Sequence, residues 1–190
     1  YEISLGLVGS EMCIRDREKA LDKLRGMFGF AVWNEKEQTL MLARDFFGIK
    51  PVYYAEIDGH FVFASEIKSI LAFPGYERKV NQKALEQYLS FQYAPLEETF
   101  FKGIYKLMPG HMLLYKNGNY EIKTYFKTKL TPGKWNRTTN MDQLRSQLAE
   151  ILKDSVKHHM LSDVEVGAFL SGGVDSGYLA SASGADQAFT

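Results

Sequence analysis

The chain has 190 residues, of which 45% are hydrophobic and 14% aromatic, and its 23 basic side chains balance 23 acidic ones, so the formal net charge is zero. This balance gives no electrostatic reason to expect nucleic acid or a membrane as a partner, and no apolar run reaches the roughly 20 residues of a membrane span. The single cysteine, Cys13, excludes an internal disulfide, which suits the cytoplasmic location that we expect.

Four segments typical of β-strands follow a short predicted helix at 18–26. They are MFGFAVWN, TLMLARD, PVYYAEI and HFVFASE, all rich in β-branched and aromatic residues. Asp58-Gly59, between the last two, is a signal for a type I′ hairpin. Apolar residues at adjacent as well as alternate positions predict one antiparallel sheet covered on both faces, as in a sandwich layer.

Two helices and a second hairpin come next. Residues 66–73 and 82–91 have helical periodicity, and Asn81 is the predicted N-cap of the second helix. The pattern HMLLYK-NG-NYEIKTYF predicts a hairpin that turns at Asn117-Gly118.

A polar stretch that contains Pro and Gly and has no periodicity then separates two domains. We place the linker at 131–140, between domains at 18–130 and 141–190. The second domain opens with an amphipathic helix, followed by a short buried strand, VEVGAFL, a glycine-rich loop and a further helix. Phe189-Thr190 resembles the start of the next parallel strand. This order predicts an α+β part followed by an α/β part with a parallel sheet.

The loop SGGVDS joins the predicted buried strand to the last helix. A strand that enters a helix through glycines gathers free backbone N–H groups at the positive end of the helix dipole, which favours an anion. Gly172 and Gly173 let the backbone approach a phosphate, and Ser171 and Ser176 add hydroxyl donors. Asp175 would repel a bare phosphate, so its presence suits a cation such as Mg²⁺ that bridges it to phosphate oxygens.

Two other loop types are excluded, and one plain alternative stays open. No lysine follows the second glycine, as a Walker A loop requires. Phe169 stands where a nucleophile elbow needs its first glycine. The alternative is a tight turn in which the aspartate and the serines only cap the helix.

The loop resembles the pyrophosphate-binding loop of the ATP pyrophosphatases, which cleave ATP between the α and β phosphates. LRGMFGFAVWN, LARDFFGIKPVYY, FVFASEIKSIL and MPGHMLLYKNG resemble, in that order, the later half of the glutaminase domain of glutamine-hydrolysing asparagine synthetases. SDVEVGAFLSGGVDS resembles the beginning of their synthetase domain. The resemblance covers nearly all of residues 18–190.

This resemblance implies two partial domains. The first would be an antiparallel αββα domain of the N-terminal-nucleophile hydrolase type, and the second would be the first βα unit of a Rossmann-like ATP pyrophosphatase domain. In the family, the first domain frees ammonia from glutamine. The second uses ATP to convert aspartate into β-aspartyl-AMP, which ammonia then converts into asparagine.

The resemblance also assigns ligands to individual residues. By motif match, the pyrophosphate loop comprises Ser171, Gly172, Gly173, Asp175 and Ser176. Asp175 would bind Mg²⁺, and Phe169 and Leu170 lie where the family's adenosine pocket begins. The implied partners are glutamine, aspartate and ATP, without nucleic acid or membrane, and a homodimer is kept open.

The chain departs from the family at its beginning. The family's glutaminase uses a cysteine at the mature N-terminus, whose own amine activates the thiol, whereas this chain begins with Tyr1. Cys13 is internal and its neighbours do not match, so we do not assign it as the nucleophile. Because SLGLVGSEMCIRDR resembles a translated sequencing adaptor, we interpret residues 1–17 as a leader that is not native. We expect the 190 residues to catalyse neither half-reaction.

Three further groups of polar residues are interpreted as structural: Arg44 and Asp45 with Lys50, Ser65 with Glu66, and His158 with His159. The first group suits a turn with ion pairs. The second suits a carboxylate at a helix N-terminus, and the third suits histidines at a helix C-terminus.

Two other functions stay open. A related adenylating enzyme, such as a β-lactam synthetase or another amidotransferase, would keep the loop and act on a different acceptor. A non-catalytic binding module would keep the sheet only to support an interface.

Overall fold

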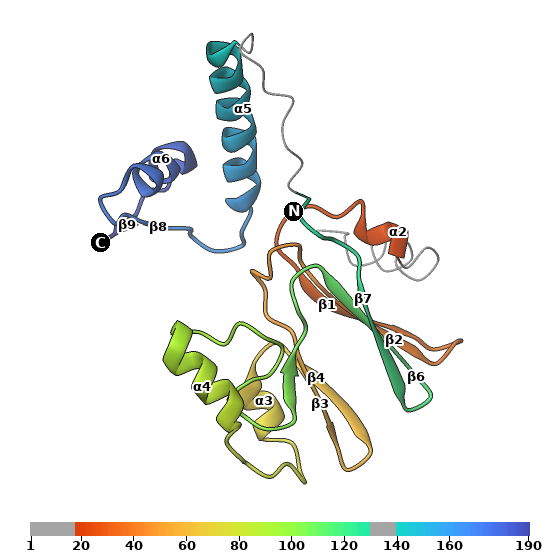
Figure 1. Ribbon diagram of the computed structural model, residues 1–190. Helices are drawn as coiled ribbons and strands as arrows, with labels where there is room; N and C mark the ends of the chain where they lie inside the picture. Colours follow the sequence, from red (N-terminus) through yellow and green to blue (C-terminus); the bar gives the residue numbers. More distant parts are fainter. Residues whose placement is uncertain (1–17, 130–139) are drawn as a thin grey trace. The chain divides into compact units, whose positions relative to one another are not determined.

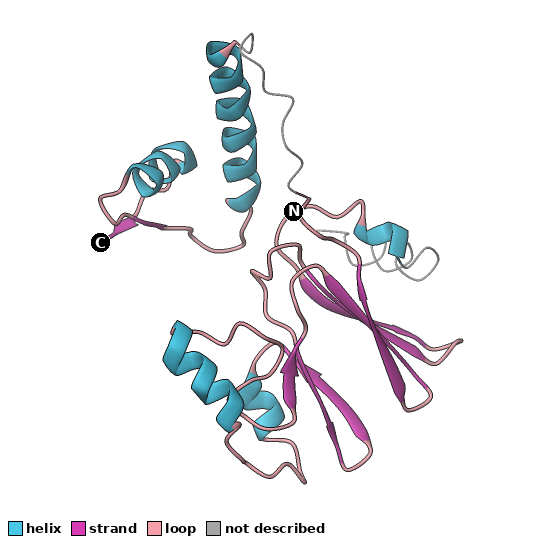
Figure 2. Cartoon of the chain, in the orientation of Figure 1, coloured by secondary structure: helices cyan, strands magenta, loops and turns pink. Residues whose placement is uncertain are grey.

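The computed structural model describes residues 18–129 and 140–190, and the chain divides between Thr128 and Lys129 into two compact units (Figure 1). Residues 1–17, with Cys13, and nearly all of the predicted linker lie outside the described residues. The described part of the first unit has two antiparallel sheets with short helices beside them, whereas that of the second has two helices and two short strands (Figure 2).

One sheet of the first unit has four antiparallel strands in the order β1-β2-β6-β7. Their bounds are Gly29–Asn34 for β1, Thr39–Arg44 for β2, His111–Lys116 for β6 and Asn119–Thr124 for β7. The predicted hairpin of β6 and β7 is confirmed. At its turn Asn117 and Gly118 have φ of 52° and 76°, the positive values that a type I′ turn requires.

The other sheet has three antiparallel strands in the order β4-β3-β5. Their bounds are Tyr53–Ile57 for β3, His60–Ala64 for β4 and Ile104–Lys106 for β5. The prediction that residues 27–66 form one sheet is therefore wrong. They contribute one pair of strands to each of two sheets. The short strand β5 was not predicted, because three residues carry too little pattern. Its pairing with β3, from Tyr53 opposite Lys106 to Ala55 opposite Ile104, defines it.

The strand β2 is buried on both faces, as its continuous apolar run predicts. Successive side chains of a strand point to opposite faces of a sheet. Leu40 and Leu42 therefore share one buried cluster, with Val52, Tyr54, Leu107 and Leu113. Met41 and Ala43 share another, with Ala20, Leu21 and Met112.

Three helices lie in the described part of the first unit. The helix α2 (Glu18–Leu21) ends before the predicted 18–26, and hydrogen bonds from Lys23 N to Ala20 O and from Leu24 N to Leu21 O continue it as tighter turns. The helices α3 (Ile67–Leu71) and α4 (Gln82–Phe91) lie beside the three-stranded sheet (Figure 1). Asn81 caps α4 as predicted, because its side chain accepts a hydrogen bond from the Ala84 N–H.

The second unit follows the predicted order of helix, strand, loop, helix and strand. Its elements are α5 (Met141–His159), β8 (Ala168–Phe169), α6 (Val174–Ser183) and β9 (Ala188–Phe189). The strands β8 and β9 pair in parallel, with Phe169 opposite Phe189. None of the described helices in either unit combines the length and the apolar composition that crossing a membrane requires.

Candidate functional site

The loop that carries the SGGVDS motif lies between the end of β8 and the start of α6. The Leu170 N–H donates a hydrogen bond to the Phe189 carbonyl at 2.7 Å, which extends the parallel ladder up to the edge of the loop. Gly172 then takes a φ of 77°, a left-handed conformation that side chains disfavour. Gly173 returns to an extended conformation and forms the N-cap of α6. The chain therefore turns from strand to helix within three residues.

The two serines of the loop are linked to each other across it. The Ser176 hydroxyl donates to the Gly173 carbonyl at 3.1 Å, and the Ser171 and Ser176 hydroxyl oxygens lie 3.1 Å apart. Because the Ser176 proton is used at Gly173, Ser171 is the donor in the pair. This chain of hydrogen bonds fixes both hydroxyls on the same side of the turn.

The first turn of α6 has no side-chain cap. Gly173 provides no side-chain cap, and the first helical bond runs from the Gly177 N–H to the Gly173 carbonyl at 3.0 Å. The N–H groups of the first turn of a helix have no partner within the helix. A Cβ built on Gly172 would meet no atom within 4 Å, and one built on Gly173 would meet only the two serine oxygens, at 3.7 and 3.8 Å. A phosphate group can therefore approach the backbone here.

Asp175 is the acidic residue of that first turn, and its side chain is exposed. Among the described residues there is no group of three His, Cys, Asp or Glu side chains that could hold a metal ion. Mg²⁺ needs no such group when it arrives with phosphates, since it is commonly held by one or two carboxylates, substrate phosphates and water. A single carboxylate beside an open phosphate cradle fits Mg²⁺ in that form.

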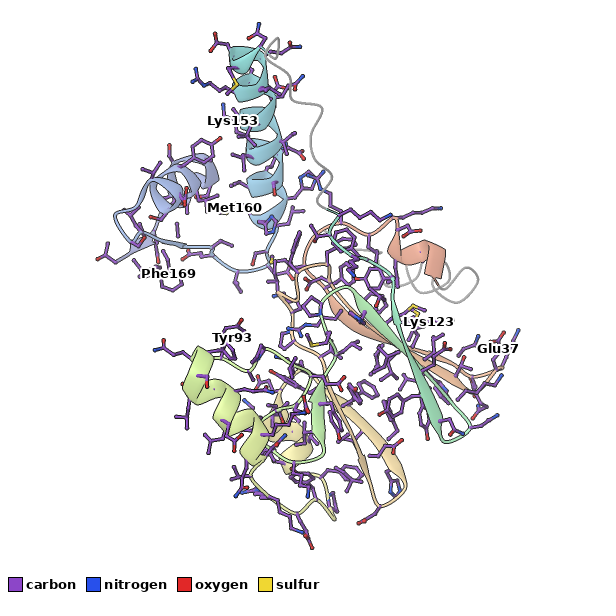
Figure 3. All side chains as sticks on the ribbon, in the orientation of Figure 1. Glu37, Tyr93, Lys123, Lys153, Met160 and Phe169 are labelled. Carbon is purple, nitrogen blue, oxygen red and sulfur yellow. The ribbon has the colours of Figure 1, made fainter. Side chains whose placement is uncertain are left out.

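Phe169 and Leu170 lie where the strand enters the loop, but the prediction of a buried strand does not hold for this segment. The Phe169 side chain is drawn and labelled in Figure 3. It is 87% exposed, and its ring lies 6.2 Å from that of Phe189 on the neighbouring strand. The physical reason is that a two-stranded parallel sheet cannot cover its own faces. Leu170 is half-buried.

The carboxylate of Asp45 organises a turn after β2. It is only 1% exposed and accepts four backbone N–H groups: Phe47 and Ile49 on Oδ1, and Phe28 and Lys50 on Oδ2. Burial by itself would raise the pKa of this carboxyl, but the four hydrogen bonds outweigh burial and hold the pKa below its usual value.

Arg44, next to it, donates to three backbone carbonyls on both sides of the turn. Its Nε bonds Lys50 O at 2.8 Å, Nη1 bonds Leu107 O at 2.7 Å and Nη2 bonds Gly48 O at 2.6 Å. The predicted turn is thus confirmed. Among the described residues, the side chains of Arg44 and Asp45 hold this turn through hydrogen bonds to the backbone rather than through the predicted ion pairs. Both side chains serve the structure, in agreement with the sequence analysis.

Tyr125 is a partner of this turn that the sequence did not reveal. Its hydroxyl donates to the Arg44 carbonyl at 2.5 Å, across 81 residues of sequence. Burial, assisted by the negative charge of Asp45, raises the pKa of this phenol to about 12. No local pattern distinguishes it from the chain's other tyrosines, so only the fold identifies it.

The other polar residues singled out in the sequence are also structural. Glu66 is the N-cap residue of α3 but makes no side-chain cap, and instead pairs with Lys68 at 2.5 Å. His158 and His159 end α5 as predicted, and their Nδ1 atoms lie 2.8 Å from the carbonyls of Asp154 and Ser155.

Two known protein families match separate parts of the chain, and the boundary between the two compact units falls in the gap between the matches. A family described as "Glutamine amidotransferase domain" matches residues 11–126, and a family described as "Asparagine synthase" matches residues 147–188. The first match begins within the stretch 1–17 that we interpreted as a leader. The second match includes the whole SGGVDS loop.

Individual proteins are similar over most of this chain. Asparagine synthetase [glutamine-hydrolyzing] 1 of Bacillus subtilis is 42% identical over 166 residues, which are 87% of this chain and 26% of that protein. A putative asparagine synthetase [glutamine-hydrolyzing] of Mycobacterium tuberculosis is 38% identical over 164 residues, 83% of this chain and 25% of that protein. The amidase chyE of Penicillium rubens is 33% identical over 161 residues, 84% of this chain and 23% of that protein.

The chain thus spans about a quarter of the length of the curated relatives that it matches. The amidotransferase match alone covers more than half of the 190 residues, and it includes every described strand of the two antiparallel sheets. The chain therefore belongs to the glutamine amidotransferase domain family, and residues 147–188 match the asparagine synthase family.

Proposed function

We propose that the full-length protein containing this chain is a glutamine-dependent asparagine synthetase. The observation that carries the proposal is the order of the two family matches in one chain, with the SGGVDS loop inside the second. The reaction would use ATP to activate the side-chain carboxylate of aspartate and ammonia from glutamine to form the amide. Asparagine, AMP and pyrophosphate would be the products.

The loop would bind the phosphates that leave as pyrophosphate. The N–H groups at the start of α6 would donate to phosphate oxygens, supported by the positive end of the helix dipole. Ser171 and Ser176 already have their hydroxyls on one side of the turn, where a small rotation of each would let it donate to the ligand. Gly172 and Gly173 add no side-chain atoms of their own there, and a Cβ built on Gly173 would meet only the two serine oxygens.

Asp175 would hold Mg²⁺ together with the ATP phosphates. A bound Mg²⁺ would neutralise charge on the leaving pyrophosphate. The exposure of this carboxylate at the first turn of α6 supports the proposal, since it lies in the same turn as the N–H groups that would bind the phosphates. Phe169 and Leu170 would form the start of the adenosine pocket, which requires the exposed Phe169 ring to be covered by nucleotide or by further protein.

The first unit would belong to the domain that frees ammonia from glutamine. The amidotransferase match supports this assignment. The glutaminase nucleophile is not assigned to any residue of the chain, and Cys13 lies outside the described residues. Domains at 18–130 and 141–190, joined by a linker at 131–140, remain our proposal for the native organisation.

A second candidate function is favoured by one specific relative. The Penicillium rubens protein that matches 84% of this chain is named an amidase. A chain with this loop could therefore serve an adenylating amidotransferase whose acceptor is not aspartate. The loop geometry is common to both functions, so the acceptor must be identified by experiment.

The test is the exchange of labelled pyrophosphate into ATP by the full-length protein, measured with and without aspartate. Exchange that requires aspartate is the expected result. Asp175→Asn should reduce exchange by about 100-fold or more, since it removes the carboxylate that would hold Mg²⁺ against the leaving pyrophosphate. Asp163→Asn is the matched control, because Asp163 is an exposed aspartate of the same unit outside the loop, and it should exchange at the unmodified rate.

Each other outcome has a defined meaning. Exchange that requires a different carboxylic acid would replace the first function by the second. Absence of exchange with every acceptor, together with absence of ATP binding, would leave a non-catalytic binding module. Full activity of Asp175→Asn would show that Asp175 does not belong to the site.

A further inference from the structure

The turn of the β6–β7 hairpin combines three features that favour a chemical change of Asn117. Asn117 and Gly118 are both exposed, and both lie outside the strand pairing, which closes at Lys116 opposite Asn119. Gly118 has no Cβ to shield its backbone nitrogen from the preceding side chain. The turn therefore presents an asparagine carboxamide and an unshielded amide nitrogen side by side at a solvent-exposed tip.

The carboxamide of Asn117 is also not held by hydrogen bonds to the described residues. In the part of the chain that the structure describes, no residue makes a hydrogen bond to it. By contrast, each other described asparagine uses its carboxamide in a hydrogen bond, as Asn34, Asn81, Asn119 and Asn140 do. None of those four precedes a glycine. Asn117 thus differs from them in both its neighbour and its freedom.

We propose that Asn117 is a site of spontaneous deamidation. The deprotonated backbone nitrogen of Gly118 forms a bond to Cγ of Asn117, the bond from Cγ to Nδ2 breaks, and Nδ2 leaves as ammonia after taking up a proton. Water then opens the cyclic imide at either of its two carbonyl carbons. One opening gives aspartate with the original backbone, and the other gives isoaspartate, whose backbone runs through the side-chain carbon.

The hairpin of β3 and β4 provides an internal comparison. Asp58 and Gly59 form the same kind of turn, with φ of 47° and 78°. There the Asp58 carboxylate is packed against Gly75, where an added Cβ would lie 2.1 Å from Oδ2. The Asp58 carboxylate therefore lies against a neighbouring loop, whereas Asn117 is exposed and its carboxamide makes no hydrogen bond to the described residues.

Isoaspartate at position 117 would have a structural consequence as well as a charge. A two-residue turn fits its strands with no spare backbone atom, so an added backbone carbon would disturb the pairing of Lys116 with Asn119. The strand β7 is an edge strand that pairs only with β6 in its sheet. The damage would therefore fall on β7 first, while β1, β2 and β6 stay paired.

The test is to incubate the folded chain in mildly alkaline buffer and to map its peptides by mass spectrometry over time. Deamidation at Asn117 should be at least about tenfold faster than at any of the four other described asparagines, because only its following residue lacks a Cβ. The isoaspartate product should show faster hydrogen exchange at the amides of β7. Asn117→Asp should keep those amides protected, since it adds the charge without changing the backbone.

Asn117→Gln is the control for the chemistry. Its longer side chain does not form the same imide, and glutamine tolerates the left-handed conformation elsewhere in this chain, at Gln38 and Gln92. This variant should show no isoaspartate at position 117. The proposal is overturned if Asn117 reacts no faster than the other asparagines, or if it reacts only when urea has unfolded the chain.

Discussion

Replacing Asp45 by asparagine changes one atom at the centre of the turn after β2. Each carboxylate oxygen accepts two backbone N–H groups, at 3.1 and 3.0 Å on Oδ1 and at 3.3 and 2.8 Å on Oδ2. The amide of asparagine has one oxygen and one NH₂ group. In either orientation, two N–H groups of the turn would therefore face a donor instead of an acceptor.

The expected loss in the free energy of unfolding follows from the number of N–H donors left without an acceptor. A buried donor that loses its acceptor costs about 1–3 kcal/mol, so two of them cost roughly 2–6 kcal/mol. The site is 1% exposed, which prevents water from taking the place of the lost oxygen without movement of the backbone. Small domains are stable by only about 5–15 kcal/mol, so Asp45→Asn should remove a large fraction of the free energy of unfolding.

The assay is urea unfolding of the chain, followed by circular dichroism of its sheets and by hydrogen exchange at Phe28, Phe47, Ile49 and Lys50. These four amides should lose protection in Asp45→Asn before the rest of the unit does. Asp22→Asn is the matched control, because it makes the same substitution at an exposed turn. It should change the free energy of unfolding by no more than about 0.5 kcal/mol.

The pH dependence gives a second readout of the same carboxylate. Its pKa in the folded chain is lower than the usual 3.8, so its contribution to stability is complete above that pH and is lost as the pH falls through the folded pKa. Asp45→Asn should remove this loss at acid pH. If the variant unfolds at the same urea concentration as the unmodified chain and its four amides stay protected, the carboxylate does not hold this turn and the reasoning is refuted.

Two further predictions concern the same unit. The pKa of Tyr125 is raised from 10.0 to about 12, so the stability that the phenol contributes should be present below pH 10 and lost as the pH rises toward 12. A tyrosinate absorbance titration and unfolding in alkali would measure this loss, and Tyr125→Phe should abolish it. Gly110→Ala should destabilise the unit by about 3 kcal/mol or more, because φ is 67° and an added Cβ would lie 2.5 Å from the Phe126 carbonyl oxygen. Gly103→Ala, with φ of 82° and open space, should cost only about 1 kcal/mol, and equal losses in urea unfolding would contradict the steric account.

The sequence by itself determined the elements whose causes are local. Two residues with positive φ define the turn at Asn117-Gly118 and the turn at Asp58-Gly59, and the dipeptides Asn-Gly and Asp-Gly predict such turns directly. Asn81 caps α4 through a hydrogen bond that spans three residues. The SGGVDS loop is likewise local, since its glycines, serines and helix start follow one another in the chain.

Only the tertiary structure decided how distant segments combine. Nothing in residues 27–66 indicates that one pair of strands joins β6 and the other joins β5, because apolar patterns specify a buried face but not the neighbour that covers it. Tyr125 reaches Arg44 across 81 residues, and Arg44 reaches Leu107 across 63, for the same reason. Phe169 is the clearest case in which the sequence did not predict burial. Its segment has the composition of a buried strand, yet the side chain is 87% exposed, because a strand is buried only where other elements pack on its faces.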